Sequence, residues 1–280
     1  MRLILLTTLA MIAFAANSVL NRVAVAPGWI GPVEFAVIRL GAGAAMLAVL
    51  LLARRAAQGG RVWPGTDGRA VGVTGLLVYL FGFSLAYRGL DAGTGALILF
   101  GAVQITMFTG ALVSHESLPP RRLAGAGLAM AGLALLLTPG GGALPSMALM
   151  AAAGIGWGFY SLAGRKAADP LSATAWNFLL AVPVTLALLP LLGWQIPEGR
   201  GVALSILSGA ITSGLGYALW YALLPKLGAA RAGVAQLTVP MLAALGGAAL
   251  IAEVPTPRFW IASAIVLGGV AVASLPARRR

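Results

Sequence analysis

Long apolar segments alternate with short polar ones along the whole chain. A helix needs roughly 20 apolar residues to cross the hydrocarbon core of a bilayer. Segments near this length lie at 3–24, 32–53, 70–88, 92–113, 121–138, 146–164, 172–192, 201–223, 229–250 and 258–276. The connections are short and most contain proline, glycine or arginine, so no linker can hold a soluble domain. The pattern predicts an all-α polytopic membrane protein with ten transmembrane helices.

The composition agrees with a surface that faces lipid. Of the 280 residues, 60% are hydrophobic and 9% are charged, whereas soluble proteins carry about 25% charged residues. Cysteine is absent and His115 is the single histidine, which excludes a disulfide framework, a cysteine nucleophile and a cluster of histidines. The phosphate-binding motif G-x-x-x-x-G-K-[ST] does not occur. We therefore expect no cofactor, no metal and no built-in ATPase.

The distribution of positive charge predicts the orientation. The formal net charge is +12, which in a soluble protein would suggest a nucleic-acid partner. Cytoplasmic loops of membrane proteins carry an excess of Lys and Arg. With the N-terminus inside, the outside segments hold only Arg22, Arg88, Arg200 and Arg258, and most other basic residues lie inside. We expect both termini in the cytoplasm and no nucleic-acid partner. The Arg-over-Lys and Ala bias suggests a bacterial plasma (inner) membrane.

The two halves of the chain share a spaced set of residues. The matched pairs, 137 to 143 positions apart, are Ser18/Ser161, Arg22/Arg165, Pro32/Pro170, Arg39/Asn177, Glu116/Glu253 and Pro120/Pro257. Each half contains five apolar segments, and because five is odd the second half enters the membrane from the opposite side. This predicts two inverted five-helix repeats, residues 1–140 and 141–280, with the substrate site near the midplane. The first segment also has features of a signal peptide, but its apolar run continues and the repeat needs it.

Several motifs point to a known family. They are Trp157-Gly158…Ser161…Arg165-Lys166, Pro32…Arg39, the span-end Glu116 and Glu253, and Gln236-Leu237-Thr238-Val239-Pro240. Over essentially the whole chain the sequence resembles the EamA-type branch of the drug/metabolite transporter superfamily, and most of all the YddG-type amino-acid exporters. The resemblance implies export of aromatic and other neutral amino acids. The repeat is imperfect, with Phe14 opposite Trp157 and Val103 opposite Pro240.

Polar and aromatic side chains near mid-span are candidates for a substrate site, because polar groups in hydrocarbon are costly and tend to face a cavity. The candidates are Asn17, Ser18, Arg39, Tyr79, Gln104, Thr106, Trp157, Tyr160, Ser161, Trp176, Asn177, Tyr217, Gln236 and Thr238. Pro183 and Pro240 could act as hinges or only as static kinks. Ser and Thr also bond within helices, and Trp29, Trp63, Trp194 and Trp260 suit the interfacial belt.

Arg39 leaves two interpretations open. It lies seven residues into its segment, five after Glu34. An ionisable residue inside a membrane suggests a functional role, here the attraction of a substrate carboxylate. It could instead extend to the outer interface or pair with Glu34.

The acidic residues favour neutral or zwitterionic substrates. All seven fall at or near span ends, so we expect no central carboxylate for proton relay or for a cationic drug. Export of a different metabolite or drug remains the alternative. An intramembrane enzyme is a remote one, since no catalytic constellation of side chains is evident. The expected partners are a small-molecule substrate and the lipid bilayer; the sequence does not give the oligomeric state.

Overall fold

The structure, a computed structural model, describes residues 1–59, 63–113, 120–137, 144–164 and 167–274. The helices are α1 (Arg2–Val25), α2 (Pro32–Gln58), α3 (Arg69–Ala86), α4 (Ala92–Val113), α5 (Pro120–Leu137), α6 (Leu144–Gly164), α7 (Pro170–Leu192), α8 (Gly199–Ile206), the π-helix η1 (Leu207–Leu215), α9 (Gly216–Gln236), α10 (Val239–Ile251) and α11 (Pro257–Ser274). The described part of the chain contains no strand. His115, Glu116, Arg165 and Lys166 lie outside the described residues.

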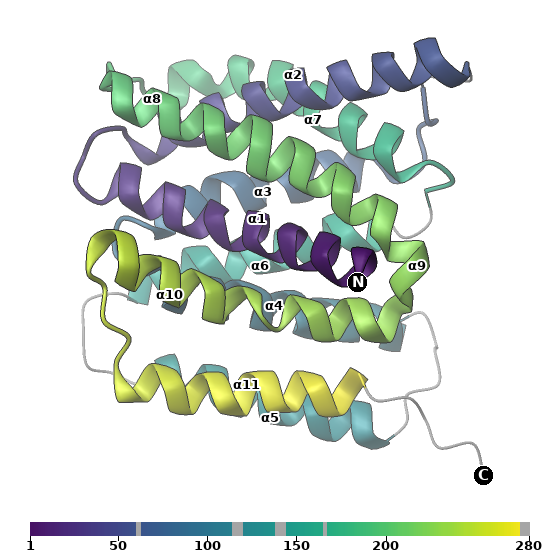
Figure 1. The fold of residues 1–280 in the computed structure, drawn as a ribbon. Coiled ribbons are helices and arrows are strands. Elements are labelled where there is room, and N and C mark those ends of the chain that lie inside the picture. The colour runs from purple at the N-terminus through teal and green to yellow at the C-terminus, as the bar shows by residue number, and fades with distance from the viewer. Residues whose placement is uncertain (60–62, 114–119, 138–143, 165–166, 275–280) are drawn as a thin grey trace.

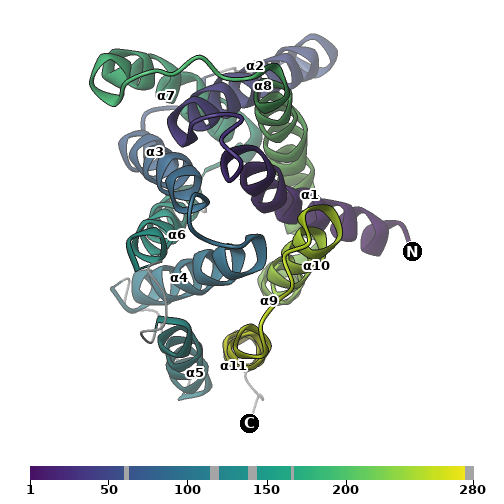
Figure 2. The ribbon, with the colours of Figure 1, turned by 90° about the vertical axis from the view of Figure 1, so that its left-hand side faces the viewer.

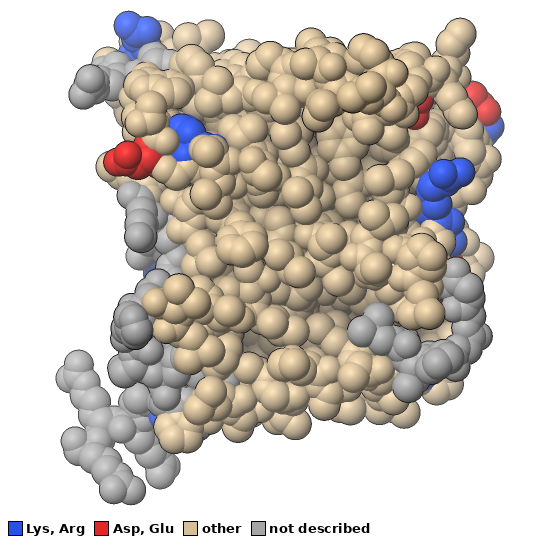
Figure 3. Space-filling view, turned by 180° about the vertical axis from the view of Figure 1, so that it is seen from behind, with Lys and Arg blue, Asp and Glu red and all other residues tan. Residues whose placement is uncertain are grey.

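The helices are long and apolar enough for a membrane. Within the described residues, seven have the length and hydropathy to cross a bilayer, and three shorter apolar helices accompany them. The helices run side by side across the molecule (Figure 1). On the face shown in Figure 3, charged side chains gather at the two margins and uncharged residues fill the space between. The prediction of an all-α polytopic membrane protein is confirmed at this level.

The predicted boundary between the eighth and ninth spans is wrong. The gap expected at 224–228 lies inside α9, because α8, η1 and α9 form one helical run. The chain turns instead at Leu237–Thr238, and α10 begins with Pro240 in its first turn. Proline has no N–H to donate, so it suits the first turn of a new helix. Hydropathy shows where a run of apolar residues is interrupted, but a helix can continue through such an interruption, as α9 does here.

The two predicted hinge prolines therefore differ in position. Pro183 lies inside α7, together with Pro190. Pro240 starts α10 instead of lying within a span. An interior proline removes one backbone hydrogen bond and bends a helix, whereas a proline in the first turn does neither.

The packing is arranged around a central group of helices. Seen along the helices, α2, α7 and α8 lie at one end of the molecule and α5 and α11 at the other (Figure 2). Between them, α6 packs against α3 and α4, and α1 packs against η1, α9 and α10. Further contacts join α2 to η1 and α7, α4 to α10, and α5 to α11.

Glycines allow α6 to approach both of its neighbours. A Cβ added at Gly156 would lie 2.8 Å from the carbonyl oxygen of Gly75 in α3, and one added at Gly75 would lie 2.6 Å from that of Gly156. On the other side of α6, a Cβ at Gly158 would lie 2.6 Å from Thr106 of α4. Close backbone approach through small residues is how membrane helices pack in the absence of a hydrophobic driving force.

The end of α2 is tied to the start of α7 by an ion pair. Arg54 Nη1 donates to Asp169 Oδ1 at 2.9 Å, and a second bond joins Nη2 to Oδ2. Asp169 also caps α7, since Ser172 N donates to its carboxylate at 3.2 Å. The Arg54 guanidinium, and then the Ser172 N–H, lower the pKa of the Asp169 carboxyl below its ordinary value.

We expect Gly156→Ala to lower the unfolding free energy by about 1–3 kcal/mol, because the added methyl meets backbone atoms that cannot move aside. The matched control is Gly41→Ala in α2, where a Cβ would meet nothing within 4 Å. Alanine there should be neutral or stabilising by up to about 1 kcal/mol. Thermal unfolding in detergent micelles measures both. Equal midpoints for the two variants would contradict the packing described here.

Removing the charge of Asp169 should make stability less dependent on acid pH. Asp169→Asn keeps a side chain that can cap α7 but loses the ion pair. Because both side chains of the pair are about one-third exposed, the pair contributes about 1 kcal/mol or less to the free energy of unfolding. A carboxyl group whose pKa is lower in the folded state than in the unfolded state stabilises the fold. This stabilisation is complete above the unfolded-state pKa of about 3.9 and is lost as the pH falls through the folded-state pKa. The difference in unfolding midpoint between wild type and Asp169→Asn should therefore be largest near neutral pH and shrink below about pH 4. A constant difference down to pH 3 would contradict the assignment.

Candidate functional site

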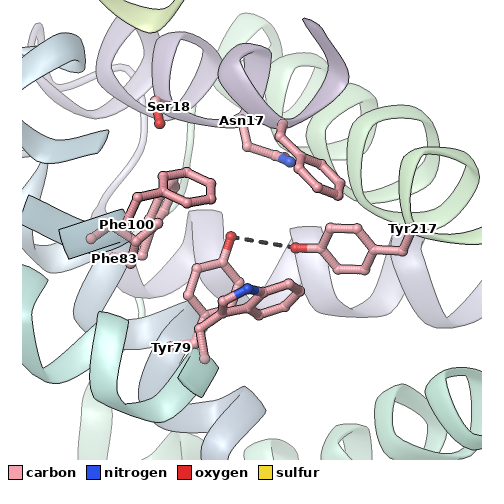
Figure 4. Close-up of a pocket in the computed structure, with 9 residues that line it drawn as sticks. Asn17, Ser18, Tyr79, Phe83, Phe100 and Tyr217 are labelled. Carbon is pink, nitrogen blue, oxygen red and sulfur yellow. Dashed lines mark hydrogen bonds between the residues drawn. The ribbon is translucent and has the colours of Figure 1, made fainter. Parts of the chain in front are cut away.

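A pocket lies among the helices at the centre of the bundle. Its lining comes from α1, α3, α4, α6 and α9 and consists of Phe14, Asn17, Ser18, Tyr79, Phe83, Leu99, Phe100, Trp157 and Tyr217 (Figure 4). Most of these side chains are aromatic, and the polar ones carry amide or hydroxyl groups. The lining contains no acidic or basic side chain. Such walls suit a solute with an apolar body and a few hydrogen-bonding groups.

Trp157 is the centre of the aromatic wall. Its ring centroid lies 4.8 Å from that of Tyr79 and 5.1 Å from that of Tyr217. Behind it, Tyr160 stacks on Trp157 at 4.9 Å with an interplanar angle of 20°. Tyr160 is itself fixed because its hydroxyl donates to Thr174 at 3.0 Å. Aromatic contacts of this kind hold the rings in defined orientations.

The hydroxyl groups of Tyr79 and Tyr217 point toward each other across the pocket, 3.4 Å apart (Figure 4). Arg39, on α2, donates from Nη2 to the Tyr79 hydroxyl at 2.8 Å and to the Tyr217 hydroxyl at 3.5 Å. Its guanidinium carbon also lies 5.0 Å from the ring centroid of Phe83. Arg39 is 0% exposed, so a buried cation stands directly behind two hydroxyls of the pocket.

Neither local interpretation of Arg39 holds. Full burial means that it does not extend to the interface. It does not pair with Glu34, whose carboxylate accepts from the backbone N–H of Gln195 near the end of the bundle. The partners of Arg39 are instead the two tyrosines and Ser213, to which Nε donates at 3.1 Å.

A polar network connects α1 to η1 beside the pocket. The Oδ1 atom of Asn17 accepts from the hydroxyls of Ser208 at 2.8 Å, Thr212 at 2.6 Å and Ser213 at 3.2 Å. The wider turn of a π-helix places residues five apart on one face, which brings Ser208 and Ser213 to the same amide. π-helical segments are often found at functional sites. Because Ser213 also accepts from Arg39, the network runs from α2 through η1 to α1.

The structure brings some of the predicted site residues together and separates others. Asn17, Ser18, Tyr79, Trp157 and Tyr217 line the pocket, and Arg39 and Tyr160 contact its walls. The other candidates have different partners. Three hydroxyls donate to nearby backbone carbonyl oxygens: Ser161 to Trp157, Thr238 to Ala235 and Thr106 to Ala102. Trp176 packs on Trp63, and Asn177 accepts a hydrogen bond from Arg69.

Gln104 and Gln236 lie in a second pocket. Its lining is Leu97, Phe100, Gly101, Gln104, Gln236, Leu237, Val266, Leu267 and Val270. Phe100 belongs to both linings and stands between the two pockets. The two amides therefore adjoin the aromatic pocket without lining it.

One end of the bundle is held by an ion pair. Arg22 Nε donates to Glu253 Oε1 at 2.5 Å, and Arg22 Nη1 donates to the carbonyl oxygen of Tyr87 at 3.0 Å. The other carboxylate oxygen of Glu253 accepts from the backbone N–H of Ala92 at 2.8 Å. These bonds join α1, the end of α3, the start of α4 and the connection between α10 and α11.

Acidic side chains are absent from the middle of the described helices. Glu34 lies in the first turn of α2, and Asp67, Asp91, Asp169, Glu198 and Glu253 lie between helices. No group of three His, Cys, Asp or Glu side chains that could hold a metal occurs in the described residues.

Sequence reasoning missed part of the site. Phe83 follows Tyr79 by one helical turn, so the period of a helix could have found it. Phe100 carries no such signal, because one phenylalanine among many apolar residues does not show which way it points. Ser208, Thr212 and Ser213 form a cluster of hydroxyls in an apolar span, which was a usable signal.

Comparison with known proteins gives consistent matches. The EamA-like transporter family matches residues 1–138 and 144–275. An uncharacterized protein of Pseudomonas aeruginosa is 47% identical over 98% of this chain and 95% of its own length. The aromatic amino acid exporter YddG of Ancylobacter novellus is 28% identical over 74% of this chain and 76% of its own length. The fold is also similar to that of a protein solved by crystallography, with a TM-score of 0.73 and 23% sequence identity. The match covers 100% of this chain and 99% of the crystallised chain.

Proposed function

The chain belongs to the EamA-like transporter family, and from that premise we propose that it exports small neutral or zwitterionic metabolites, foremost aromatic and other amino acids. Membership of the family makes it a multi-pass membrane transporter, not an enzyme. The substrate and the mechanism of alternating access are parts of the proposal.

The observation that carries the proposal is the lining of the central pocket. Trp157, Phe14 and Phe100 give it aromatic walls for an apolar side chain, and the hydroxyls of Tyr79 and Tyr217 give it hydrogen-bonding groups. An amino acid combines these two requirements. The name of the Ancylobacter relative, an aromatic amino acid exporter, supports the same class of substrate.

We further propose that the chain crosses the membrane ten times, as two inverted five-helix repeats over residues 1–140 and 141–280. The two matches of the family, one in each half, support this. The helix contacts support it as well. The first helix of the second half, α6, packs on α3 and α4, and the first helix of the first half, α1, packs on the corresponding segments η1, α9 and α10. Tyr79 and Tyr217, whose hydroxyls meet, are 138 positions apart, as are Pro32 and Pro170.

In this proposal the two halves rock about the central pocket and expose it to each side in turn. Pro183 within α7 and Pro240 at the start of α10 serve as hinges. Both termini are placed in the cytoplasm and the protein in the bacterial inner membrane, as the excess of Lys and Arg on one side supports.

Transport is tested with purified protein in proteoliposomes and radiolabelled amino acids, with and without a pH gradient. We expect uptake without a pH gradient, competed by aromatic and aliphatic amino acids. Trp157→Ala should lower uptake at subsaturating substrate by about tenfold, because it removes the central aromatic wall. The control is Trp260→Ala, an outward residue of α11 that is 45% exposed and should transport like wild type.

Folding of each variant is verified by monodisperse elution and by a cooperative unfolding transition that lies above the assay temperature. Uptake that requires a pH gradient would disprove the facilitative mechanism. Failure of folded wild-type protein to move any amino acid would disprove the substrate class.

Orientation can be tested with single cysteines, since the chain contains none. We expect Gln195→Cys, in the exposed connection after α7, to react with an impermeant maleimide in intact spheroplasts. Thr66→Cys, in the exposed connection before α3, should react only after permeabilisation. The positive-inside distribution is the physical reason. Reversed labelling of the two positions would place the termini outside.

A further inference from the structure

Arg39 carries a positive charge for which the described part of the chain provides no counterion. The side chain is fully buried, and an arginine stays protonated in proteins. Its hydrogen bonds go to hydroxyl groups of Tyr79, Tyr217 and Ser213, and its Nη1 atom, also buried, has no hydrogen-bond partner. The described ion pairs involve other arginines. A buried, unpaired charge is costly, so its persistence calls for an anion in the working cycle.

The surroundings direct this charge toward the pocket. The ring of Phe83 lies beside the guanidinium at 5.0 Å, and the hydroxyls of Tyr79 and Tyr217 accept hydrogen bonds from Nη2. All three rings line the pocket. An anion in the pocket would therefore meet two hydroxyl groups polarised by the cation behind them.

The tyrosine pair has a proton to give. Each phenol carries one proton, and the bond between the two hydroxyls uses only one of them. The other proton is available to an acceptor in the pocket. Hydrogen bonds in chains polarise one another, so a hydroxyl that accepts from a guanidinium is a stronger donor.

We infer that Arg39, acting through Tyr79 and Tyr217, is the positioning charge for a carboxylate on the transported solute. The inference rests on the proposed function and deepens it: the recognised class is a carboxylate with an apolar or aromatic body, and an ammonium group is not required. The pocket lining contains no carboxylate for an ammonium, and the cation behind it disfavours amines. Arg39 thus selects acids over the corresponding amides and amines.

The test compares four ligands that share a phenyl group: L-phenylalanine, L-phenylalaninamide, 3-phenylpropionate and phenethylamine. Binding to purified protein in detergent is followed by tryptophan fluorescence, and transport is followed in proteoliposomes. We expect the two carboxylates to bind wild type at least about tenfold more tightly than the amide and the amine, as for a charge-assisted hydrogen bond. Arg39→Gln should remove this preference, and Arg39→Lys should keep part of it.

The matched control is Arg69→Gln. Arg69 is also a buried arginine of a described helix, but it donates to Ala173 O and Asn177 Oδ1 of α7 and does not line the pocket. Its replacement should keep the preference for carboxylates, whatever it does to stability. Arg39→Gln removes the guanidinium that bonds both tyrosine hydroxyls and can destabilise the fold. For that case Tyr79→Phe and Tyr217→Phe remove one hydroxyl each and keep the rings, and each should weaken the preference several-fold.

The outcomes separate this inference from the proposed function. If wild type transports phenylalanine and its amide equally well, and folded Arg39→Gln or both tyrosine variants do the same, the inference is overturned. Amino-acid export is then left standing. Binding of 3-phenylpropionate that depends on Arg39, without transport of any amino acid, would support the inference and refute the substrate class. Binding of none of the four ligands by folded wild type would overturn the inference, and failure to transport any amino acid as well would overturn the proposed function. Binding that depends on chloride and ignores the carboxylate would assign the charge to an inorganic anion and overturn the inference.

Discussion

Within a bilayer no water is present to satisfy a polar group, so each polar side chain inside the bundle needs a partner from the protein. The chain of bonds from Arg39 to Ser213 and from Ser213 to Asn17 meets this need across α2, η1 and α1. Because each member has its partner on another helix, the bonds fix the three helices relative to one another. Arg39 also donates from Nη2 to Tyr79 and Tyr217, so the same side chain joins the packing of the bundle to the polar side of the pocket.

The π-helix makes this arrangement possible on both of its faces. Ser208 and Ser213, five residues apart, turn toward Asn17 of α1. Gly209 and Gly214, also five apart, turn toward α2, where a Cβ at Gly209 would lie 2.3 Å from the carbonyl oxygen of Arg39. An α-helix would bring residues three or four apart to one face. The wider turn thus adds Ser213 to the hydroxyls that bind the amide of Asn17. It also turns Gly209 toward the backbone of α2 and Gly214 toward the side chain of Met46.

The sequence was sufficient for most of the helical spans, but not for the boundary between the eighth and ninth spans or for the directions in which side chains point. The first seven spans match the helices α1 to α7 and the last matches α11, because the hydropathy pattern depends only on which residues are apolar. The rotation of each helix depends on its neighbours. Asn177 was predicted for the pocket and is instead held by Arg69 of α3, and Trp176 packs on Trp63. The π-helix shifts the register within one span, and no hydropathy pattern reports such a shift. The burial of Arg39 behind Tyr79 likewise depends on the meeting of three helices.

The pocket lies between two unlike ends of α4. At the Ala92 end, the Glu253 carboxylate accepts from the first N–H of α4 and pairs with Arg22 of α1. One turn beyond Phe100 in the other direction, Gln104 lines the second pocket, so the neighbouring space there already offers polar groups. A charge-assisted bond therefore joins α1 to the α10–α11 connection, whereas the side chain that belongs to both pockets, Phe100, is apolar. The two ends of α4 therefore differ in what surrounds them: charge-assisted bonds at the Ala92 end, and an apolar ring with two amides beyond it in the other direction.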